Sequence, residues 1–144
     1  MSDNPIILTA VDHERLNTLI YEYTNHRLGM DGRALKALAR EIDRAQIVDP
    51  QALPHDVVTM DTEANVLDLD KGEVMRMRVC WPERSDPLRG YISVLAPLGL
   101  ALLGTREGDE VEWPVPDGWR RLRVEKVLFQ PEAAAQPSPG PEAA

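Results

Sequence analysis

The spacing of apolar residues changes once along this chain, near a pair of prolines, and that change limits the folds open to it. Before Pro50, apolar residues recur every three or four positions, as they do on one face of a helix. The two stripes are Leu16, Leu19, Ile20 and Tyr23, followed by Leu35, Leu38, Ile42 and Ala45. After Pro54, apolar and polar residues alternate, which is typical of strands. The chain is therefore predicted to be α+β, with the helices before the strands.

The two stripes predict a short N-terminal antiparallel helical hairpin over residues 1–49. Thr9 is suited to cap the first helix, because its hydroxyl is followed three positions later by an acid, Asp12. The segment 29–32 interrupts the pattern with two glycines, and Asp31 is placed to cap the second helix. Helices of this length reach about 25 Å. We expect the hairpin to depend on the downstream domain for part of its stability, because its apolar seam is narrow.

Residues 54–130 form the second predicted domain, an antiparallel sheet around one short helix. Its strand candidates are residues 57–60, 65–69, 74–81, 92–95, 110–113 and 121–129. Turn sequences at 70–72, 108–109 and 117–118 separate several of them. In the candidate 74–81 one face carries Met75, Met77, Val79 and Trp81, while Arg76 and Arg78 point the other way. In the last candidate, Leu122, Val124 and Leu128 are predicted to face the core.

The stretch from Tyr91 to Gly118 contains the predicted short helix. Pro97 disfavours a helical residue before it and is suited to a first helical turn, so a strand should give way to a helix over residues 97–103. Gly104 is suited to a left-handed C-terminal cap. These features alone predict a strand, helix and hairpin unit, without assigning it a function.

The charge of the chain narrows the choice of partners. It has 24 acidic residues against 16 lysines and arginines, a net charge of −8. This acidity disfavours non-specific binding to nucleic acid, and no segment carries a basic stripe. We therefore predict no direct contact with nucleic acid, and a basic protein surface is the more natural partner.

The two ends of the sequence lead to further expectations. No apolar run approaches the roughly 20 residues that cross a membrane, and the start, Met-Ser-Asp-Asn-Pro, lacks the regions of a signal peptide. We expect a cytoplasmic protein without membrane contact. Residues 131–144 contain four prolines and no large apolar residue, so they are predicted to be a disordered tail.

The sequence shows no arrangement of residues that would bind a metal or cofactor. The histidines His13, His26 and His55 have no metal-ligand spacing, and Cys80 is the single cysteine. There is no phosphate-binding loop, nucleophile elbow or dinucleotide fingerprint. We predict no catalytic residue, no metal and no cofactor.

Several separated motifs occur in the order found in one known family. They are Ile92-Ser93-Val94, Pro97, Ala101-Leu102-Leu103-Gly104, Gly108-Asp109-Glu110-Val111 and Pro116-Asp117-Gly118. This run resembles the C-terminal domain of the Gre transcript-cleavage factors. The run Pro54-His55-Asp56-Val57-Val58-Thr59-Met60 and the short helical region are similar to one branch, the Rnk-type regulators of nucleoside diphosphate kinase. The resemblance covers residues 6–132 and implies an FKBP-like half-barrel.

The resemblance also bears on the predicted hairpin tip. Gre factors insert a long helical hairpin into the secondary channel of RNA polymerase, where acids at its tip help to hold a catalytic magnesium ion. The tip of this chain matches only the Gly-x-Asp part of that pattern. Asp31 stands beside Arg33, and Ala34 and Leu35 occupy the positions of the second acid and the asparagine. One carboxylate holds Mg²⁺ weakly and this hairpin is shorter, so we predict a capping role for Asp31 and no cleavage activity.

A second Gre contact is the loop before the small helix, which meets the β′ coiled coil at the channel rim. By position it corresponds to Leu95, Ala96 and Pro97, so the proline is kept and the polar pair is not; Leu100 replaces an arginine. An apolar surface of Leu95, Ala96, Pro97 and Leu98 could still pack on a coiled coil, although packing within the fold explains these residues too. The implied function is a non-catalytic regulator that binds RNA polymerase near the secondary channel, competes with Gre-type factors and influences nucleoside diphosphate kinase.

Two other functions stay open on the sequence alone. FKBP-like folds include peptidyl-prolyl isomerases, which need an aromatic-lined pocket. The aromatic residues that could line one are Trp81, Tyr91, Trp113, Trp119 and Phe129, although core packing is the simpler explanation. The third candidate is a Gre-like cleavage factor with a relocated acid. The oligomeric state does not follow from the sequence.

Overall fold

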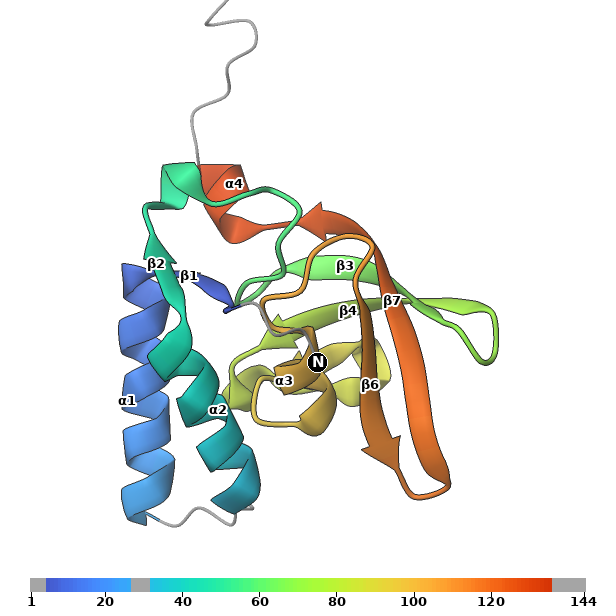
Figure 1. Cartoon of the computed structure of the whole chain (residues 1–144), viewed down its shortest axis with the longest axis horizontal. Helices are drawn as coiled ribbons and strands as arrows, with labels where there is room; N and C mark the ends of the chain where they lie inside the picture. Colours follow the sequence, from blue (N-terminus) through green and yellow to red (C-terminus); the bar gives the residue numbers. More distant parts are fainter. Residues whose placement is uncertain (1–4, 27–31, 136–144) are drawn as a thin grey trace, which may run out of the picture.

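The computed structural model describes residues 5–26 and 32–135, which form a helical part and a curled sheet (Figure 1). The helices are α1 (Ala10–His26), α2 (Gly32–Arg44), α3 (Pro97–Leu102) and α4 (Pro131–Ala135). The strands are β1 (Ile7–Thr9), β2 (Gln46–Val48), β3 (Glu63–Asp68), β4 (Glu73–Cys80), β5 (Tyr91–Ser93), β6 (Glu110–Val115) and β7 (Gly118–Phe129). Short 3-10 helices are η1 (Pro50–Ala52), η2 (Pro82–Arg84) and η3 (Pro87–Arg89). The predicted α+β class is confirmed.

Helices α1 and α2 lie side by side and bury the predicted apolar stripes (Figure 1). Leu16, Leu38 and Ile42 are fully buried. The first helix begins as predicted, because the hydroxyl of Thr9 accepts a hydrogen bond from the Asp12 amide at 3.2 Å. Strands β1 and β2, which the periodicity of the sequence does not predict, pair in parallel. They tie the chain that enters α1 to the chain that leaves α2.

The second part is a five-stranded sheet in the order β5-β4-β3-β7-β6, curled into a half-barrel (Figure 1). The turns at 70–72 and 117–118 connect antiparallel neighbours, as predicted. The prediction of an entirely antiparallel sheet is wrong for one pair, since β4 and β5 run parallel with Val79 opposite Ile92. Between them the chain passes through η2 and η3, and this loop lets it return to run in the same direction.

The segment 57–60 is buried but is not the strand that its sequence suggests. Val57, Val58 and Met60 are each 2 % exposed or less. Val58 exchanges backbone hydrogen bonds with the chain after α3: its amide donates to the Thr105 carbonyl and its carbonyl accepts from the Gly104 amide, both at 2.8 Å. A short apolar run indicates that a segment is buried, but it does not show whether its backbone will pair with a strand of the sheet.

The pairing of β3 with β7 shifts register twice, and the first shift reverses the predicted facing of the β7 residues that follow Val124. Val66 of β3 pairs with Val124, but Asn65 pairs with Lys126, so the register skips Glu125. The prediction that Leu128 faces the core is therefore wrong: Val127 packs against the core and Leu128 is 39 % exposed. A β-bulge inserts one residue and moves every later side chain to the other face of the sheet.

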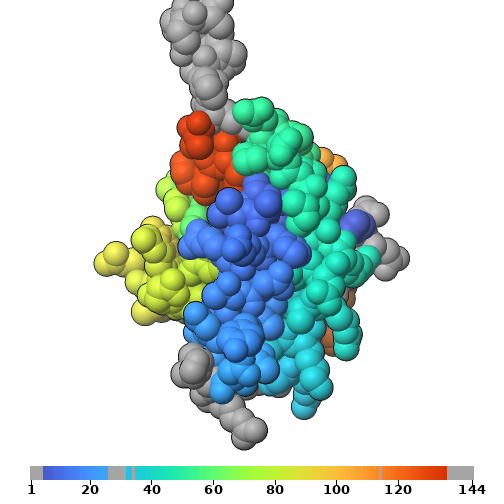
Figure 2. All heavy atoms as spheres, turned by 90° about the vertical axis from the view of Figure 1, so that its left-hand side faces the viewer, coloured from blue at the N-terminus to red at the C-terminus, as the bar shows by residue number. Residues whose placement is uncertain are grey.

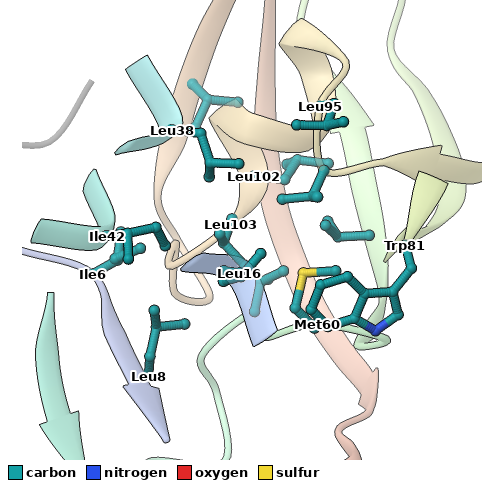
Figure 3. Packing of buried hydrophobic residues seen from close by; sticks show 14 of the residues in the cluster. Ile6, Leu8, Leu16, Leu38, Ile42, Met60, Trp81, Leu95, Leu102 and Leu103 are labelled. Atoms are coloured by element: carbon teal, nitrogen blue, oxygen red, sulfur yellow. The ribbon is translucent and has the colours of Figure 1, made fainter. Parts of the chain in front are cut away.

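One hydrophobic cluster extends from the helices into the sheet (Figure 3). Leu16, Leu38 and Ile42 of the helices belong to the same cluster as Leu102 and Leu103 of the α3 region. The expected dependence of the hairpin on the downstream domain has this shared core as its physical basis.

Gly104, which follows the end of α3, packs closely against Ile6 of the N-terminal segment. Its φ of +83° is the left-handed conformation that the sequence predicts for a helix cap. A Cβ at this position would lie 2.2 Å from Cγ2 of Ile6. Glycine is thus required here both by the backbone conformation and by the close approach of Ile6.

The prediction of a disordered tail from residue 131 is wrong for its first part, where α4 forms. Gln130 is buried, and its side-chain amide donates to the carbonyls of Pro54 and Val57, each at 2.8 Å. Figure 2 shows α4 in red, beside the start of α1 in blue and the chain before the sheet in green. The sequence signal failed because α4 attaches through polar groups rather than through apolar burial. Residues 136–144 lie outside the described part.

Candidate functional site

The loop between β5 and α3, together with the first turn of α3, contains the residues predicted to dock on a partner. Hydrogen bonds hold this loop at both ends. The hydroxyl of Ser93 accepts from the Leu95 amide at 3.1 Å, and the carbonyl of Ser93 accepts from the Ala96 amide at 3.0 Å. The Leu100 amide donates to the Ala96 carbonyl at 2.9 Å, so α3 begins directly after Ala96. Pro97 takes the first helical position, where its missing N–H leaves no carbonyl unpaired.

Gly99 allows α3 to approach the end of β5 closely. A Cβ at this position would lie 2.0 Å from the carbonyl oxygen of Ser93 and 2.7 Å from its carbonyl carbon. Both atoms belong to the backbone, so a side chain could be accommodated only by moving the helix or the strand. This contact therefore determines how the first turn of α3 is presented.

The four residues predicted to form the docking surface differ in exposure. Pro97 is exposed, and Ala96 and Leu98 are half-buried. Leu95 is only 4 % exposed and belongs to the core cluster (Figure 3), so its place in an exposed patch is contradicted. The accessible surface is therefore narrower than predicted, with Pro97 at its centre.

The predicted hairpin tip, with Asp31, lies outside the described residues, and α2 begins at Gly32. Within residues 5–26 and 32–135, no group of three histidine, cysteine or acidic side chains is placed to hold a metal ion. His13 lies on α1, and its Nε2 is 3.1 Å from the carbonyl oxygen of Ile42, which links the two helices. None of the helices in these ranges is both long and apolar enough to span a bilayer.

The aromatic residues that could have lined an isomerase pocket are dispersed. Trp81 is buried in the core, with the guanidinium of Arg15 4.3 Å from its ring centre. Tyr91 and Phe129 flank the Arg78 guanidinium on the sheet, and Trp119 is 66 % exposed at the tip of the last hairpin. A cavity between the N-terminal segment, α3 and the start of β6 has no aromatic residue in its lining. The isomerase alternative thus gains no support from the described part of the chain.

A buried acid with a second, half-buried acid near it, not predicted from the sequence, lies where α4 comes near α1. Asp12, interpreted from the sequence only as part of a helix cap, is 8 % exposed. Burial raises its pKa to about 6, and the neighbouring carboxylate of Glu132 adds to the effect. The unusual feature visible in the sequence is an acid on the apolar side of the first helix, one helical turn before Leu16. Its partner lies in the segment predicted to be disordered.

The helix pair, the curled sheet and the short helix α3 define a class of α+β proteins in which a helical unit is mounted on a half-barrel. Comparison with known proteins places the chain within that class. Residues 53–129 match the model of the C-terminal part of the GreA/GreB transcription elongation factors, and residues 4–48 match the Rnk N-terminus. The chain belongs to the GreA/GreB transcription elongation factor family.

Individual relatives agree with this assignment. The regulator of nucleoside diphosphate kinase of Escherichia coli K12 is 38 % identical over 93 % of this chain and 96 % of its own length. Transcription elongation factor GreA of a Sulfurovum species is 31 % identical over 76 % of this chain and 68 % of its own length. A solved structure of a GreA/GreB factor from Nitrosomonas europaea has a TM-score of 0.74 and 34 % identity, covering 86 % of this chain and 99 % of that one.

Proposed function

We propose that this protein is a non-catalytic transcription regulator that binds RNA polymerase near the secondary channel. It competes there with Gre-type factors and influences the level of nucleoside diphosphate kinase. The observation that carries the proposal is the loop at Ala96 and Pro97, which reaches the surface, is hydrogen-bonded at both ends and is supported by the close contact of Gly99. A turn that is already rigid loses little conformational entropy when it binds. Membership of the GreA/GreB family supports RNA polymerase as the partner.

The proposed function also implies a particular arrangement of the two parts of the chain and a particular place of action. We assign α1 and α2 to an antiparallel hairpin within residues 1–49 and the sheet within residues 54–130 to an FKBP-like half-barrel. The boundaries of the two family matches support the division. The partner surface is the β′ coiled coil at the channel rim, and the protein acts in the cytoplasm without a cofactor. Its net charge of −8 complements a basic protein surface.

Replacing Pro97 with glutamate tests the docking loop. A carboxylate at the first position of α3 is compatible with the helix, because it lies near the positive end of the helix dipole. In an interface it becomes a buried charge without a partner. We expect the Kd for core RNA polymerase to rise by about tenfold or more. The measurement is a titration of the labelled protein against core polymerase, with a thermal melt of the same variant.

Val74→Glu is the matched control for this experiment, because it adds the same charge at an exposed position on β4, away from β5. It should bind as the parent does. Excess Gre factor should displace the parent protein from the polymerase. If Pro97→Glu binds and melts like the parent, the loop is not the docking surface.

A substitution of Asp31, at the predicted hairpin tip, tests whether the protein lacks transcript-cleavage activity. Asp31 has no second acid among its sequence neighbours to help hold Mg²⁺. Asp31→Asn should therefore leave the effect on transcription unchanged, since asparagine is also a good helix cap. The parent protein should not stimulate transcript cleavage by a backtracked polymerase. Cleavage that depends on Asp31 would instead identify a Gre-like factor.

A further inference from the structure

Acidic side chains from three separate elements meet where α4 contacts the rest of the molecule. Asp12 extends from α1 and Glu132 from α4, and Asp61 lies on the loop before β3. The carboxyl groups of Asp12 and Glu132 are placed to share a hydrogen bond. The Thr59 hydroxyl donates to Oε1 of Glu132 at 2.7 Å. Arg15, one turn along α1, is the cation that faces Asp12.

Two carboxyl groups can share a hydrogen bond only if one of them carries a proton. Asp12 is suited to carry it, because it is 8 % exposed and burial penalises its charged form. Arg15 compensates for only part of the negative charge, and its guanidinium also lies over the ring of Trp81. When Asp12 is ionised, it faces the carboxylates of Glu132 and Asp61 in a poorly solvated place.

Besides α1, helix α4 lies against the short helix η1 (Pro50–Ala52), so its position does not depend on Glu132 alone. The helix spans Pro131–Ala135 and buries none of its residues. Gln130 anchors the chain just before it, and within the helix the Ala134 amide donates to the Gln130 carbonyl at 3.0 Å. Glu132 is thus the side chain of α4 that connects it to Thr59 and to α1. Figure 2 shows α4 against the start of α1 on this face.

We propose that Asp12 and Glu132 form a proton-dependent latch, which holds α4 against α1 and the loop of Thr59 in mildly acidic solution and releases it as the pH rises. When Asp12 loses its proton and α4 is released, the junction between the helical part and the sheet becomes exposed.

The direction of the pH dependence follows from the ionisation of Asp12. Its pKa is about 6 in the folded protein, above the ordinary value of 3.8. A raised carboxyl pKa means that the folded state binds the proton more tightly than the unfolded chain does. The stabilising contribution is therefore complete below the ordinary value and is lost as the pH rises through about 6.

Nuclear magnetic resonance on the full chain tests the latch from about pH 4.5 to about pH 8, a range that brackets the raised pKa of Asp12. We expect the carboxyl carbon of Asp12 and the amides of Ala133–Ala135 to change with a common midpoint near pH 6. Above the midpoint, relaxation of these amides should show increased motion of α4. Observing the carboxyl carbon directly assigns the transition to Asp12 and not to the adjacent His13. An Asp12 midpoint near its ordinary value, or α4 amides that do not change across pH 6, would overturn the proposal.

Variants separate the latch from general effects of charge. Asp12→Asn keeps the backbone amide that Thr9 caps, and its neutral side chain can donate to Glu132 at any pH. In this variant α4 should stay ordered throughout the titration, without a transition. Glu132→Gln should likewise remove the transition. Glu22→Gln, at an exposed position on the same helix, should behave like the parent. A transition that persists unchanged in both Asp12→Asn and Glu132→Gln contradicts the latch.

Discussion

Replacing Gly99 with alanine is expected to destabilise this protein strongly, although the change adds only one methyl group. The new Cβ would lie 2.0 Å from the carbonyl oxygen of Ser93, well inside any van der Waals contact. The obstructing atom is backbone, so the helix or the end of β5 must move. We expect a loss of about 3 kcal/mol or more in the free energy of unfolding, and a fall in Tm of about 10 °C. Urea unfolding and a thermal melt measure the two quantities.

Gly32→Ala is the matched control, because a Cβ there would meet nothing within 4 Å. It lies at the start of α2, where alanine favours the helix, so stability should stay the same or rise slightly. A Gly99→Ala protein that melts with the parent would show that α3 and β5 can separate freely. The docking loop would then lack the rigid support on which its proposed role rests.

Leu38→Ala is expected to cost about 2 to 5 kcal/mol of unfolding free energy, because it leaves a cavity in the core. Leu38 is fully buried on α2 and belongs to the cluster that continues into the sheet. The control is Leu88→Ala, the same chemical change at a residue that is fully exposed on η3, and it should have little effect. Chemical denaturation followed by circular dichroism measures both variants.

The same experiment examines how the two parts of the chain are coupled. If the shared core makes them one cooperative unit, Leu38→Ala should shift the helical signal and the tryptophan fluorescence together, since Trp81 lies in the same cluster. Two separate transitions would instead mean that the helical part unfolds independently of the half-barrel. A loss below about 1 kcal/mol would show that Leu38 contributes little to the core.

Local patterns in the sequence were sufficient for most elements of the fold. The stripes at Leu16 and Leu38, the cap at Thr9 and the left-handed Gly104 were each predicted and confirmed, because each depends on residues close in the chain. The features that were not predicted correctly share a different cause. The bulges of β7, the parallel placement of β5 and the non-strand segment 57–60 depend on which partner each backbone meets.

The candidate site shows the same division. Pro97 at the start of α3 could be predicted from the preferences of proline, but the burial of Leu95 could not, since adjacent loop residues can point in opposite directions. The pairing of Asp12 with Glu132 joins residues from opposite ends of the chain. No local pattern indicates that such residues will meet, and Glu132 lies in a segment too polar to predict any packing.

The sequence by itself determined the class of fold, the order of the two long helices, of α3 and of strands β3 to β7, the turns at 70–72 and 117–118, and the family. These follow from periodicity, from glycine and proline conformations and from motif order, all of which are local. Only the tertiary structure decided which side of β7 is buried, how narrow the exposed part of the docking loop is, and that Glu132 of α4 lies near Asp12 of α1. Those outcomes depend on backbone pairing and on desolvation, because the environment that buries Asp12 exists only when distant segments have come together.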